Sequence, residues 1–345
     1  MNEKQKRATI VDVATRAGVS IGTVSRILNT QAGPETTRRR VLDAIADLHY
    51  VPNHVARSLK RRSTEQLALV VPDVANPVYV AMAKTIQRYA KERGYRLSLM
   101  SANDDPGEEE FALDSLEQMR VDGLIICSLK PTAKLVERLE RVRSRVCVVG
   151  RMPEEARVDI VRVDSTGGAQ EAMQHLLDGG RHHIGFINGS PGTVPAEMRA
   201  VGYRRALEEN GLHVDESLIV NGAFSMAGGY RAVDRLLGQQ HDLDAIFCAN
   251  DVMAFGAMRR LRELGIGVPS QVALVGMDDI ELGKISTPTL STVSLLAEER
   301  GRLAAELLLE RLLGGAADEP RKVTVTPRLI VRESSTDYIR HEVRA

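Results

Sequence analysis

The stretch TIVDVATRAGVSIGTVSRILN, residues Thr9 to Asn29, decides how the N-terminus of the chain is interpreted. It contains two short helical patterns separated by a glycine. The Thr9-x-x-Asp12 spacing approximates a capping box for the first helix, with Asp in place of the usual Glu or Gln. Gly18 supplies the turn, and Ser20 is a natural N-cap for the second helix.

A third helix is expected from about Pro34 to Leu48, with Pro34 at its first helical position after Gly33. The apolar faces of the second and third helices predict one small shared core. Its expected members are Val24, Ile27, Leu28, Val41, Leu42, Ile45 and Leu48. Three short helices with a tight turn between the first two describe an all-α helix-turn-helix headpiece over residues 1–50.

The charge of the chain is divided unevenly along its length. The 345 residues are 43% hydrophobic, which suits two or three folded domains and excludes a disordered or fibrous protein. Lys and Arg number 46, as do Asp and Glu, and a net charge of zero argues by itself against nucleic-acid binding. Residues 1–62, however, hold 12 basic and 5 acidic residues, and residues 63–345 hold 34 and 41. The neutral total therefore conceals a basic N-terminal segment, residues 1–62, and an acidic remainder, residues 63–345.

The three cysteines, Cys127, Cys147 and Cys248, lie in or at the end of apolar runs and form no CxxC pair. They are expected to be buried free thiols in a reducing compartment. The charged N-terminus MNEKQKR is followed by no apolar signal region, and no stretch approaches the ~18 apolar residues of a membrane span. A soluble cytoplasmic protein without a membrane partner is expected.

From Leu67 onward, short apolar runs alternate with amphipathic helices such as Asn76 to Arg93, which opens with Asn-Pro and stops at Gly94. The strand candidates are LALVV (67–71), YRLSLM (95–100), GLIIC (123–127), VCVV (146–149), HIGFI (183–187), AIFC (245–248) and VALVG (272–276). This alternation predicts an α/β unit with parallel sheets covered by helices. Its length of about 280 residues exceeds one comfortable core, so we expect two doubly wound lobes with a ligand cleft between them.

The headpiece has the chemistry of a DNA reader: a tight turn, small hydroxylated residues for phosphates and a long polar side chain for base edges. The segment resembles the headpiece of the lactose-repressor (LacI/GalR) family of bacterial transcription factors in its Asp-Val-Ala, Ala-Gly-Val-Ser and Thr-Val-Ser-Arg elements. The resemblance implies base contacts from Ile21, Gly22 and Arg26 and phosphate contacts from Ser20, Thr23, Ser25 and Asn29. Arg26 is suited to a bidentate contact with guanine O6 and N7.

Two positions depart from the family pattern. Gly22 has no side chain with which to read a base, and Pro34 stands where relatives often have a phosphate-contacting Ser. The run Arg38-Arg39-Arg40 suits phosphate contact and a solvated helix face equally well.

The basic stretch between the headpiece and the α/β unit, residues 51–64, resembles the hinge helix of the same family. The resemblance implies that two hinge helices, one from each protomer, enter the minor groove, with Leu59 as an apolar wedge. Arg57, Lys60, Arg61 and Arg62 would bind the neighbouring phosphates. The positions carried over from the family are Asn53, Ala56, Leu59 and Lys60. The alternative is an ordinary basic linker with one stray leucine.

The resemblance continues through Val71–Pro77, Cys248–Ala254, Val275–Asp279 and Leu329–Ser334. It implies a fold like that of periplasmic sugar-binding proteins over residues 65–345, with three crossovers between lobe 1 (about 65–164 and 295–325) and lobe 2 (about 165–294 and 326–340). The implied effector-binding residues are Asp73, Tyr79, Arg151, Arg199, Phe224, Asn250 and Asp278. Helix caps or salt bridges are the alternative role for any one of them.

The leading interpretation is a dimeric, ligand-responsive transcriptional repressor that binds a pseudo-palindromic operator. Leu295 and Gly150 replace a Gln and an Asp of relatives, which implies a ligand that is less polar than a plain hexose or differently arranged. The effector is expected to be a sugar or sugar derivative, with a nucleoside or a sugar acid as competitors. Relatives pair near the helices 76–93 and 250–264. No cofactor or metal is expected, and no motif indicates an enzyme. The alternative function is a cytoplasmic solute-binding receptor with a degenerate headpiece.

Overall fold

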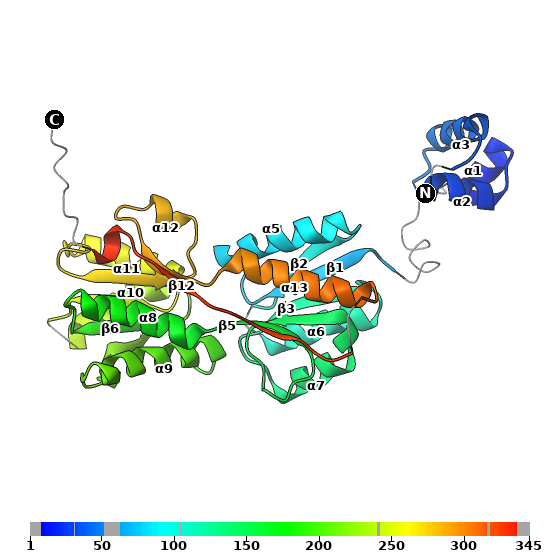
Figure 1. The fold of residues 1–345 in the computed structure, drawn as a ribbon. Helices are drawn as coiled ribbons and strands as arrows, with labels where there is room; N and C mark the ends of the chain where they lie inside the picture. Colours follow the sequence, from blue (N-terminus) through cyan, green and yellow to red (C-terminus); the bar gives the residue numbers. More distant parts are fainter. Residues whose placement is uncertain are drawn as a thin grey trace, which may run out of the picture. The chain divides into compact units, whose positions relative to one another are not determined.

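The protein divides into two compact units between Thr64 and Glu65. The structure is a computed structural model and describes residues 8–30, 32–51, 63–103, 105–239, 242–315 and 318–336, with the side chains of Asn29 and Pro106 excepted. Figure 1 shows a three-helix N-terminal unit and a C-terminal α/β unit with two lobes. Each unit is described separately.

The N-terminal unit has three helices, and its sequence signals act as expected at the first turn. The helices are α1 (Ile10–Ala17), α2 (Ile21–Thr30) and α3 (Glu35–Asp47). Thr9 and Asp12 form the predicted capping box, and Gly18 ends α1 in the left-handed conformation at φ 63°. The Ser20 hydroxyl accepts a hydrogen bond from the Thr23 amide at 3.1 Å, which caps α2.

Two details of the third helix differ from the prediction. Pro34 is the N-cap rather than the first helical residue, since its ψ of 139° is extended. Leu42 is 52% exposed, whereas Val41 and Ala44 are buried. The side that faces the core is centred on these two positions, three residues apart, and Leu42 lies about 100° around the helix from Val41. The buried core consists of Val13, Ala14, Ala17, Val24, Ile27, Val41 and Ala44.

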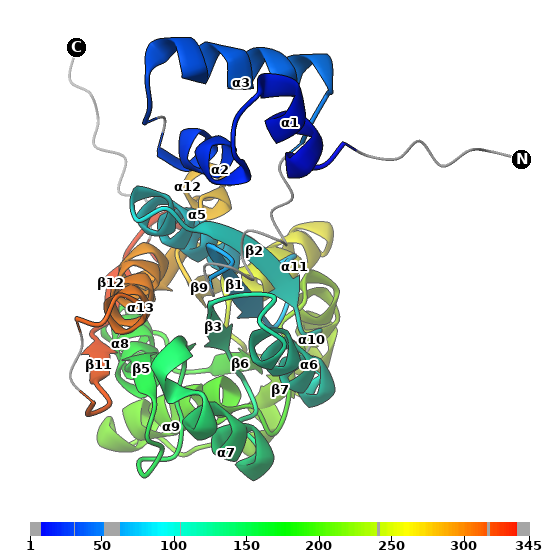
Figure 2. The same ribbon diagram turned by 90° about the vertical axis from the view of Figure 1, so that its right-hand side faces the viewer.

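Lobe 1 is a six-stranded, fully parallel sheet in the order β11-β5-β4-β3-β1-β2. Its strands are β1 (Gln66–Val71), β2 (Arg96–Ser101), β3 (Gly123–Cys127), β4 (Val146–Val149), β5 (Asp159–Val163) and β11 (Lys322–Val325). Alternate strand residues enter two separate cores. One is covered by α5 (Pro77–Glu92) and α13 (Ala297–Leu312), and the other by α6 (Pro106–Glu117) and α7 (Ala133–Arg141). Figure 2 shows β11 at the edge of this sheet beside β5.

Lobe 2 repeats this plan in the strand order β12-β10-β9-β8-β6-β7. Its strands are β6 (Ile184–Asn188), β7 (Ile219–Asn221), β8 (Ala245–Cys248), β9 (Ala273–Met277), β10 (Ser291–Ser294) and β12 (Arg328–Ile330). Its helices are α8 (Ser165–Asp178), α9 (Val194–Glu209), α10 (Met226–Gln239), α11 (Asp251–Glu263) and the short α12 (Leu282–Ile285). Short 3-10 turns lie at Glu216–Leu218 and Glu333–Ser335 in this lobe and at Arg143–Arg145 in lobe 1.

The edge strand β12 is the exception to the predicted parallel sheets, because it pairs with β10 in the antiparallel direction. The direction of β12 follows from the side of the sheet at which the chain enters lobe 2. The other strands of lobe 2 end at the side of the sheet that faces lobe 1, whereas β12 begins there, directly after β11. The prediction of parallel sheets is therefore wrong for this one pair.

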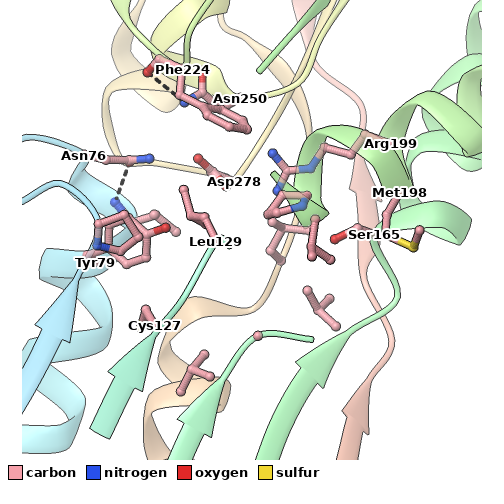
Figure 3. Close-up of a pocket in the computed structure, with 18 of the residues that line it drawn as sticks. Asn76, Tyr79, Cys127, Leu129, Ser165, Met198, Arg199, Phe224, Asn250 and Asp278 are labelled. Atoms are coloured by element: carbon pink, nitrogen blue, oxygen red, sulfur yellow. Dashed lines mark hydrogen bonds between the residues drawn. The ribbon is translucent and has the colours of Figure 1, made fainter. Parts of the chain in front are cut away.

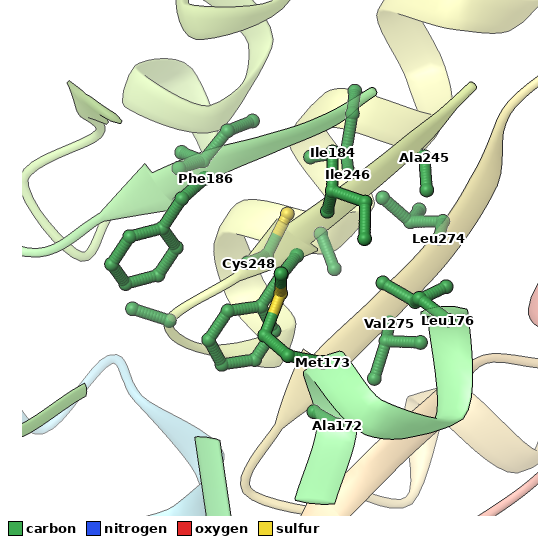
Figure 4. Packing of buried hydrophobic residues seen from close by; sticks show 14 of the residues in the cluster. Ala172, Met173, Leu176, Ile184, Phe186, Ala245, Ile246, Cys248, Leu274 and Val275 are labelled. Carbon is green, nitrogen blue, oxygen red and sulfur yellow. The ribbon is translucent and has the colours of Figure 1, made fainter. Parts of the chain in front are cut away.

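The core of lobe 2 is built around three stacked aromatic rings. The Phe186 ring centroid lies 5.2 Å from that of Tyr203 and 4.9 Å from that of Phe247. Ile184, Ile246, Leu274 and other aliphatic residues fill the space around them (Figure 4). This packing fixes the sheet on which the cleft residues of lobe 2 are mounted.

The chain passes between the lobes three times within the described residues (Figure 1). Asp164 joins β5 to α8, Leu295 and Leu296 join β10 to α13, and the pair 326–327 joins β11 to β12. Each connection is at most two residues long. The lobes are thus held edge to edge, with the carboxyl ends of their parallel strands facing each other.

Candidate functional site

A cavity of about 150 Å³ lies between the two lobes, at the carboxyl ends of their strands. This is where open parallel sheets bind ligands. Lobe 1 contributes the segments after β1, β3 and β4 and the start of α5, and lobe 2 contributes the first turns of α8 and α9 and the loops after β7, β8 and β9. Figure 3 shows the lining side chains converging from both sides.

All seven residues predicted to bind an effector line this cavity: Asp73, Tyr79, Arg151, Arg199, Phe224, Asn250 and Asp278. They come from distant parts of the sequence and meet because most of them follow strands that end at the same edge. Leu295 and Gly150, the two departures from the family pattern, line it as well.

Arg199 is the most enclosed cation of the lobe 2 wall, with 6% of its surface exposed. One terminal nitrogen, Nη1, donates a hydrogen bond to the Ala249 carbonyl at 2.6 Å. Its Nε has no hydrogen-bond partner among the described residues. Burial lowers the pKa of Arg199, while the nearby Asp278 carboxylate raises it. The guanidinium is therefore held in place in the cavity wall, with one buried donor unpaired among the described residues.

Phe224 lies beside this guanidinium in a constrained loop. Ala223 and Phe224 both have a φ of 51°, in the left-handed region. The Asn250 side chain fixes the loop, since its amide nitrogen donates to the Phe224 carbonyl at 3.2 Å and its oxygen caps α11 by accepting from Met253 at 2.8 Å. Asn250 thus supports the wall of the cavity in addition to lining it.

Asp278 is the buried carboxylate of the cavity and follows β9 with a φ of 132°. Burial raises its pKa to about 6, although Arg199, Arg300 and a hydrogen bond from Asn76 each lower it. Asn76 belongs to lobe 1, where its side-chain oxygen also caps α5 by accepting from the Val78 amide at 3.1 Å. The pair of Asn76 and Asp278 links the lobes across the cavity.

The remaining predicted residues lie toward the mouth and the wall of lobe 1. The Asp73 carboxylate accepts from the Ala75 amide at 2.8 Å, and the Arg151 side chain is half exposed with Nη1 3.5 Å from the Met198 sulfur. Tyr79 is enclosed, and burial raises the pKa of its hydroxyl. The hydroxyl therefore remains protonated and can donate a hydrogen bond.

Several lining residues were missed by the sequence interpretation, among them Asn76, Ser128, Ser165, Thr166, Met198 and Arg300. The sequence identifies Asn76 as the N-cap of α5, but it gives no sign that the same side chain also bonds Asp278 across the cavity. Arg300 lies in the charged run AEERGR, where no pattern separates an inward arginine from a solvated one.

The second candidate site is the outer face of α2 in the N-terminal unit. Ser20, Ile21, Gly22 and Arg26 are exposed, and Thr23 and Ser25 are half-buried. The hydroxyls of Ser20 and Thr23 lie 2.9 Å apart and share a hydrogen bond. The side chain of Asn29 and the hinge positions Asn53, Ala56, Leu59 and Lys60 lie outside the described residues. Of the arginine run, Arg39 and Arg40 are exposed.

Other chemistries receive no structural support in the described part of the chain. No group of three or more His, Cys, Asp or Glu side chains is arranged there to hold a metal ion. In the same residues, no helix is long and apolar enough to cross a bilayer. The three cysteines are buried and free, and burial raises the pKa of the Cys127 thiol to about 12.

A helix-turn-helix unit on the same chain as a two-lobed ligand-binding fold defines a ligand-responsive transcriptional regulator. Residues 9–53 match the model of bacterial regulatory proteins of the lacI family, and residues 173–335 match that of the periplasmic binding protein-like domain. The HTH-type transcriptional repressor PurR of Haemophilus influenzae (strain PittEE) is 34% identical over 330 residues, which cover 95% of this chain and 98% of that protein. The chain belongs to the lacI family of bacterial regulatory proteins.

Two solved structures extend the comparison. The transcriptional regulator CelR in complex with cellobiose is 35% identical, with a TM-score of 0.72, over 95% of this chain and all of its own. The lac repressor dimer bound to operator and the anti-inducer ONPF is 25% identical, with a TM-score of 0.81, over 96% of this chain and all of its own. Both are regulators, and their similarity extends over both units of this chain.

Proposed function

We propose that the protein is a cytoplasmic, dimeric repressor that binds a pseudo-palindromic operator and is switched by a small hydroxylated effector, and that it has no enzymatic activity. One observation carries the proposal: the same chain presents an exposed face on α2 and a cavity between two lobes that is lined by charged, polar and apolar side chains. A DNA reader and a ligand receptor on one chain are the two parts that a ligand-controlled switch requires.

In this proposal residues 1–50 read DNA, 51–64 form the hinge, and 65–345 bind the effector and the second protomer. Arg26 reads a base, and Ile21 contacts a base edge through its apolar surface. Ser20, Thr23, Ser25 and Asn29 position the headpiece on phosphates, and Leu59 acts as the minor-groove wedge. Dimerisation doubles the reading surface, which raises both affinity and discrimination between sites.

The cavity residues act as the switch. Arg199, Asp278 and Tyr79 offer donors and an acceptor to a hydroxylated molecule, and Phe224 offers a ring face. A ligand held by both lobes favours one lobe arrangement, and a preference of a few kcal/mol changes operator affinity by tens- to hundreds-fold. A solved relative with cellobiose supports a sugar or sugar derivative.

The test is fluorescence anisotropy of full-length protein on operators selected from a random double-stranded library. Wild type is compared with Arg26→Ala and Leu59→Ala, and the control is Arg231→Ala, an exposed arginine of α10. We expect Arg26→Ala to weaken operator binding by about 10- to 100-fold and to relax base preference at one position. Leu59→Ala should weaken binding to those operators whose DNA must bend in the complex.

Weak and equal binding of all four proteins to any sequence would overturn the regulator function and favour a solute receptor. Steep weakening with salt is expected, because residues 1–62 carry seven net positive charges per protomer.

A further inference from the structure

A second buried arginine faces the effector cavity from lobe 1. Arg300 lies in the first turns of α13, and 8% of its surface is exposed, against 6% for Arg199 in lobe 2. Both line the cavity. The Nε of each has no hydrogen-bond partner among the described residues, and they are two of the three buried side-chain nitrogens in that condition. A buried donor without an acceptor is costly, so such groups usually mark a missing partner.

Asp278 is the one buried carboxylate in the cavity lining that can balance the charges of these two arginines. Arg199, Arg300 and Asp278 all line the cavity, and both arginines lower the pKa of Asp278. The Arg300 charge also lowers the pKa of Arg199, after the larger effect of burial. Within the described ranges Arg300 makes no ion pair or hydrogen bond through its side chain. Two like charges therefore line one cavity that has a single buried carboxylate in its lining.

The other carboxylates near the cavity balance this excess only in part: Asp251 also raises the pKa of Arg199, but it lies outside the lining. Asp73 lies at the exposed mouth, with an oxygen engaged by the Ala75 amide. Asp251 and Glu109 are buried outside the lining, where Asp251 accepts from Thr292 and from Ile280, and Glu109 accepts from Ser128. The enclosed lining itself thus contains two guanidinium groups and one carboxylate.

We propose that the effector carries an anionic group, a carboxylate or a phosphate, next to its hydroxyl groups, and that Arg300 and Arg199 hold this anion from opposite lobes. The inference rests on the proposed function of the cavity as the effector site. Guanidinium groups bind such oxyanions through paired N–H donors. An uncharged sugar would leave the second arginine without a counter-charge. Because one arginine belongs to each lobe, the anion also joins the lobes.

The experiment is a thermal-shift and calorimetric screen of full-length protein with matched probes. The anions are glucuronate, galacturonate, gluconate and glucose 6-phosphate, and their uncharged counterparts are glucose, galactose and sorbitol. Wild type is compared with Arg300→Met, which keeps the aliphatic length and removes the charge. The control is Arg302→Met on the same helix, since Arg302 is outside the lining and is bonded to Glu299 and Glu306.

We expect at least one anion to raise the melting temperature of wild type by more than its uncharged counterpart does. Arg300→Met should lower the affinity for that anion by about 30-fold or more, leave affinity for uncharged probes within a few-fold, and not lower the melting temperature of the unliganded protein. Arg302→Met should bind the anion like wild type. A stronger response to the uronates than to the sugar phosphate would identify a carboxylate as the group.

The inference is overturned if an uncharged sugar binds as well as its anion, if no anion stabilises the protein, or if Arg300→Met lowers the melting temperature of the unliganded protein and leaves anion affinity unchanged. Operator anisotropy separates this result from the proposed function. Operator binding controlled by an uncharged ligand removes this inference alone, whereas anion binding without specific operator binding removes only the regulator function.

Discussion

The guanidinium carbon of Arg199 lies 5.7 Å from the centroid of the Phe224 ring, a cation–π contact inside the effector cavity. The ring also lies close to a glycine: a Cβ built on Gly189 would lie 1.9 to 2.4 Å from three carbons of that ring. The Phe224 ring therefore contacts both residues, and its place depends on the absence of a side chain at Gly189.

Gly189→Ala should push the Phe224 ring away from its place and weaken effector binding by about 10-fold or more, because the ring and Arg199 position each other. Isothermal titration with an effector found in the screen measures the effect. Gly238→Ala is the matched control, since a Cβ there meets nothing within 4 Å. Equal affinities for the two variants would show that the position of the Phe224 ring does not shape the site.

Arg199→Ala should abolish the effector response and leave operator binding in the absence of effector intact. The change removes the donor to the Ala249 carbonyl and the cation beside Phe224, both in the cavity wall. Arg205→Ala, an exposed position on the same helix, is the control. An operator-release curve with an unchanged midpoint for Arg199→Ala would refute the assignment.

Asp251→Asn should flatten part of the pH dependence of stability. Burial, followed by the charge of Asp278, raises the pKa of Asp251 to about 7 in the folded protein. The ordinary value of about 3.9 applies after unfolding. The folded state therefore binds this proton more tightly, and the free energy of unfolding falls as the pH rises from about 4 to about 7.

The variant lacks this loss, so it should gain stability relative to wild type between pH 5 and pH 8, by up to a few kcal/mol at about 1.4 kcal/mol per pKa unit. Asn preserves the contacts, because its oxygen can accept from the Ile280 amide and its nitrogen can donate to Thr292. Urea unfolding at several pH values tests this, and parallel curves for both proteins would contradict the buried, proton-binding carboxyl.

Asp159→Asn should destabilise lobe 1 by about 3 to 5 kcal/mol, since it leaves buried arginine charge without its partner. The Asp159 side chain is fully buried and accepts from Arg311 Nε at 2.6 Å and from the Arg321 amide at 2.7 Å. Glu137→Gln is the control, because its ion pair with Arg141 is exposed on both sides and such pairs contribute about 1 kcal/mol or less. Similar unfolding midpoints for the two variants would contradict this role of Asp159.

Gly22→Asn should change operator preference without disturbing the headpiece. Gly22 is exposed, and a Cβ there meets only the Ser20 hydroxyl oxygen, at an ordinary 3.7 Å. Asn pairs well with adenine in the major groove, so selection from a random library should enrich adenine at one position per half-site. Gly22→Ala is the control, and it should keep the wild-type preference. Identical preferences for all three proteins would show that this position does not face a base.

The fold could be predicted wherever the sequence carries a long apolar run. The seven predicted strands lie within one residue of those observed. Six of them are buried, and a strand buried on both faces is recognisable without its neighbours, whereas β2 is a largely exposed edge strand. The strands β5, β7, β10, β11 and β12 were missed. Their sequences DIVRV, IVN, STVS, KVTV and RLI are short or mixed in polarity, and they become strands by pairing with a sheet that other segments supply.

The cavity could be predicted in outline for a related reason. Residues that follow buried strands converge at one sheet edge, so the positions of Asp73, Arg151 and Asp278 follow from those of the strands. Arg300 and Asn76 could not be placed in this way. Their roles depend on which helix face turns toward the other lobe, and that orientation is a property of the assembled lobes.

The three short connections between the lobes determine how the protein can move. A single connection would let the lobes rotate freely about it. Three connections are expected to allow the lobes to open and close and to resist rotation of one lobe against the other. Leu295 belongs to one of these connections and also lines the cavity, so a bound molecule would contact a connection between the lobes directly. We therefore expect a ligand to act by changing how far the two lobes are open, because three connections restrict their other relative motions.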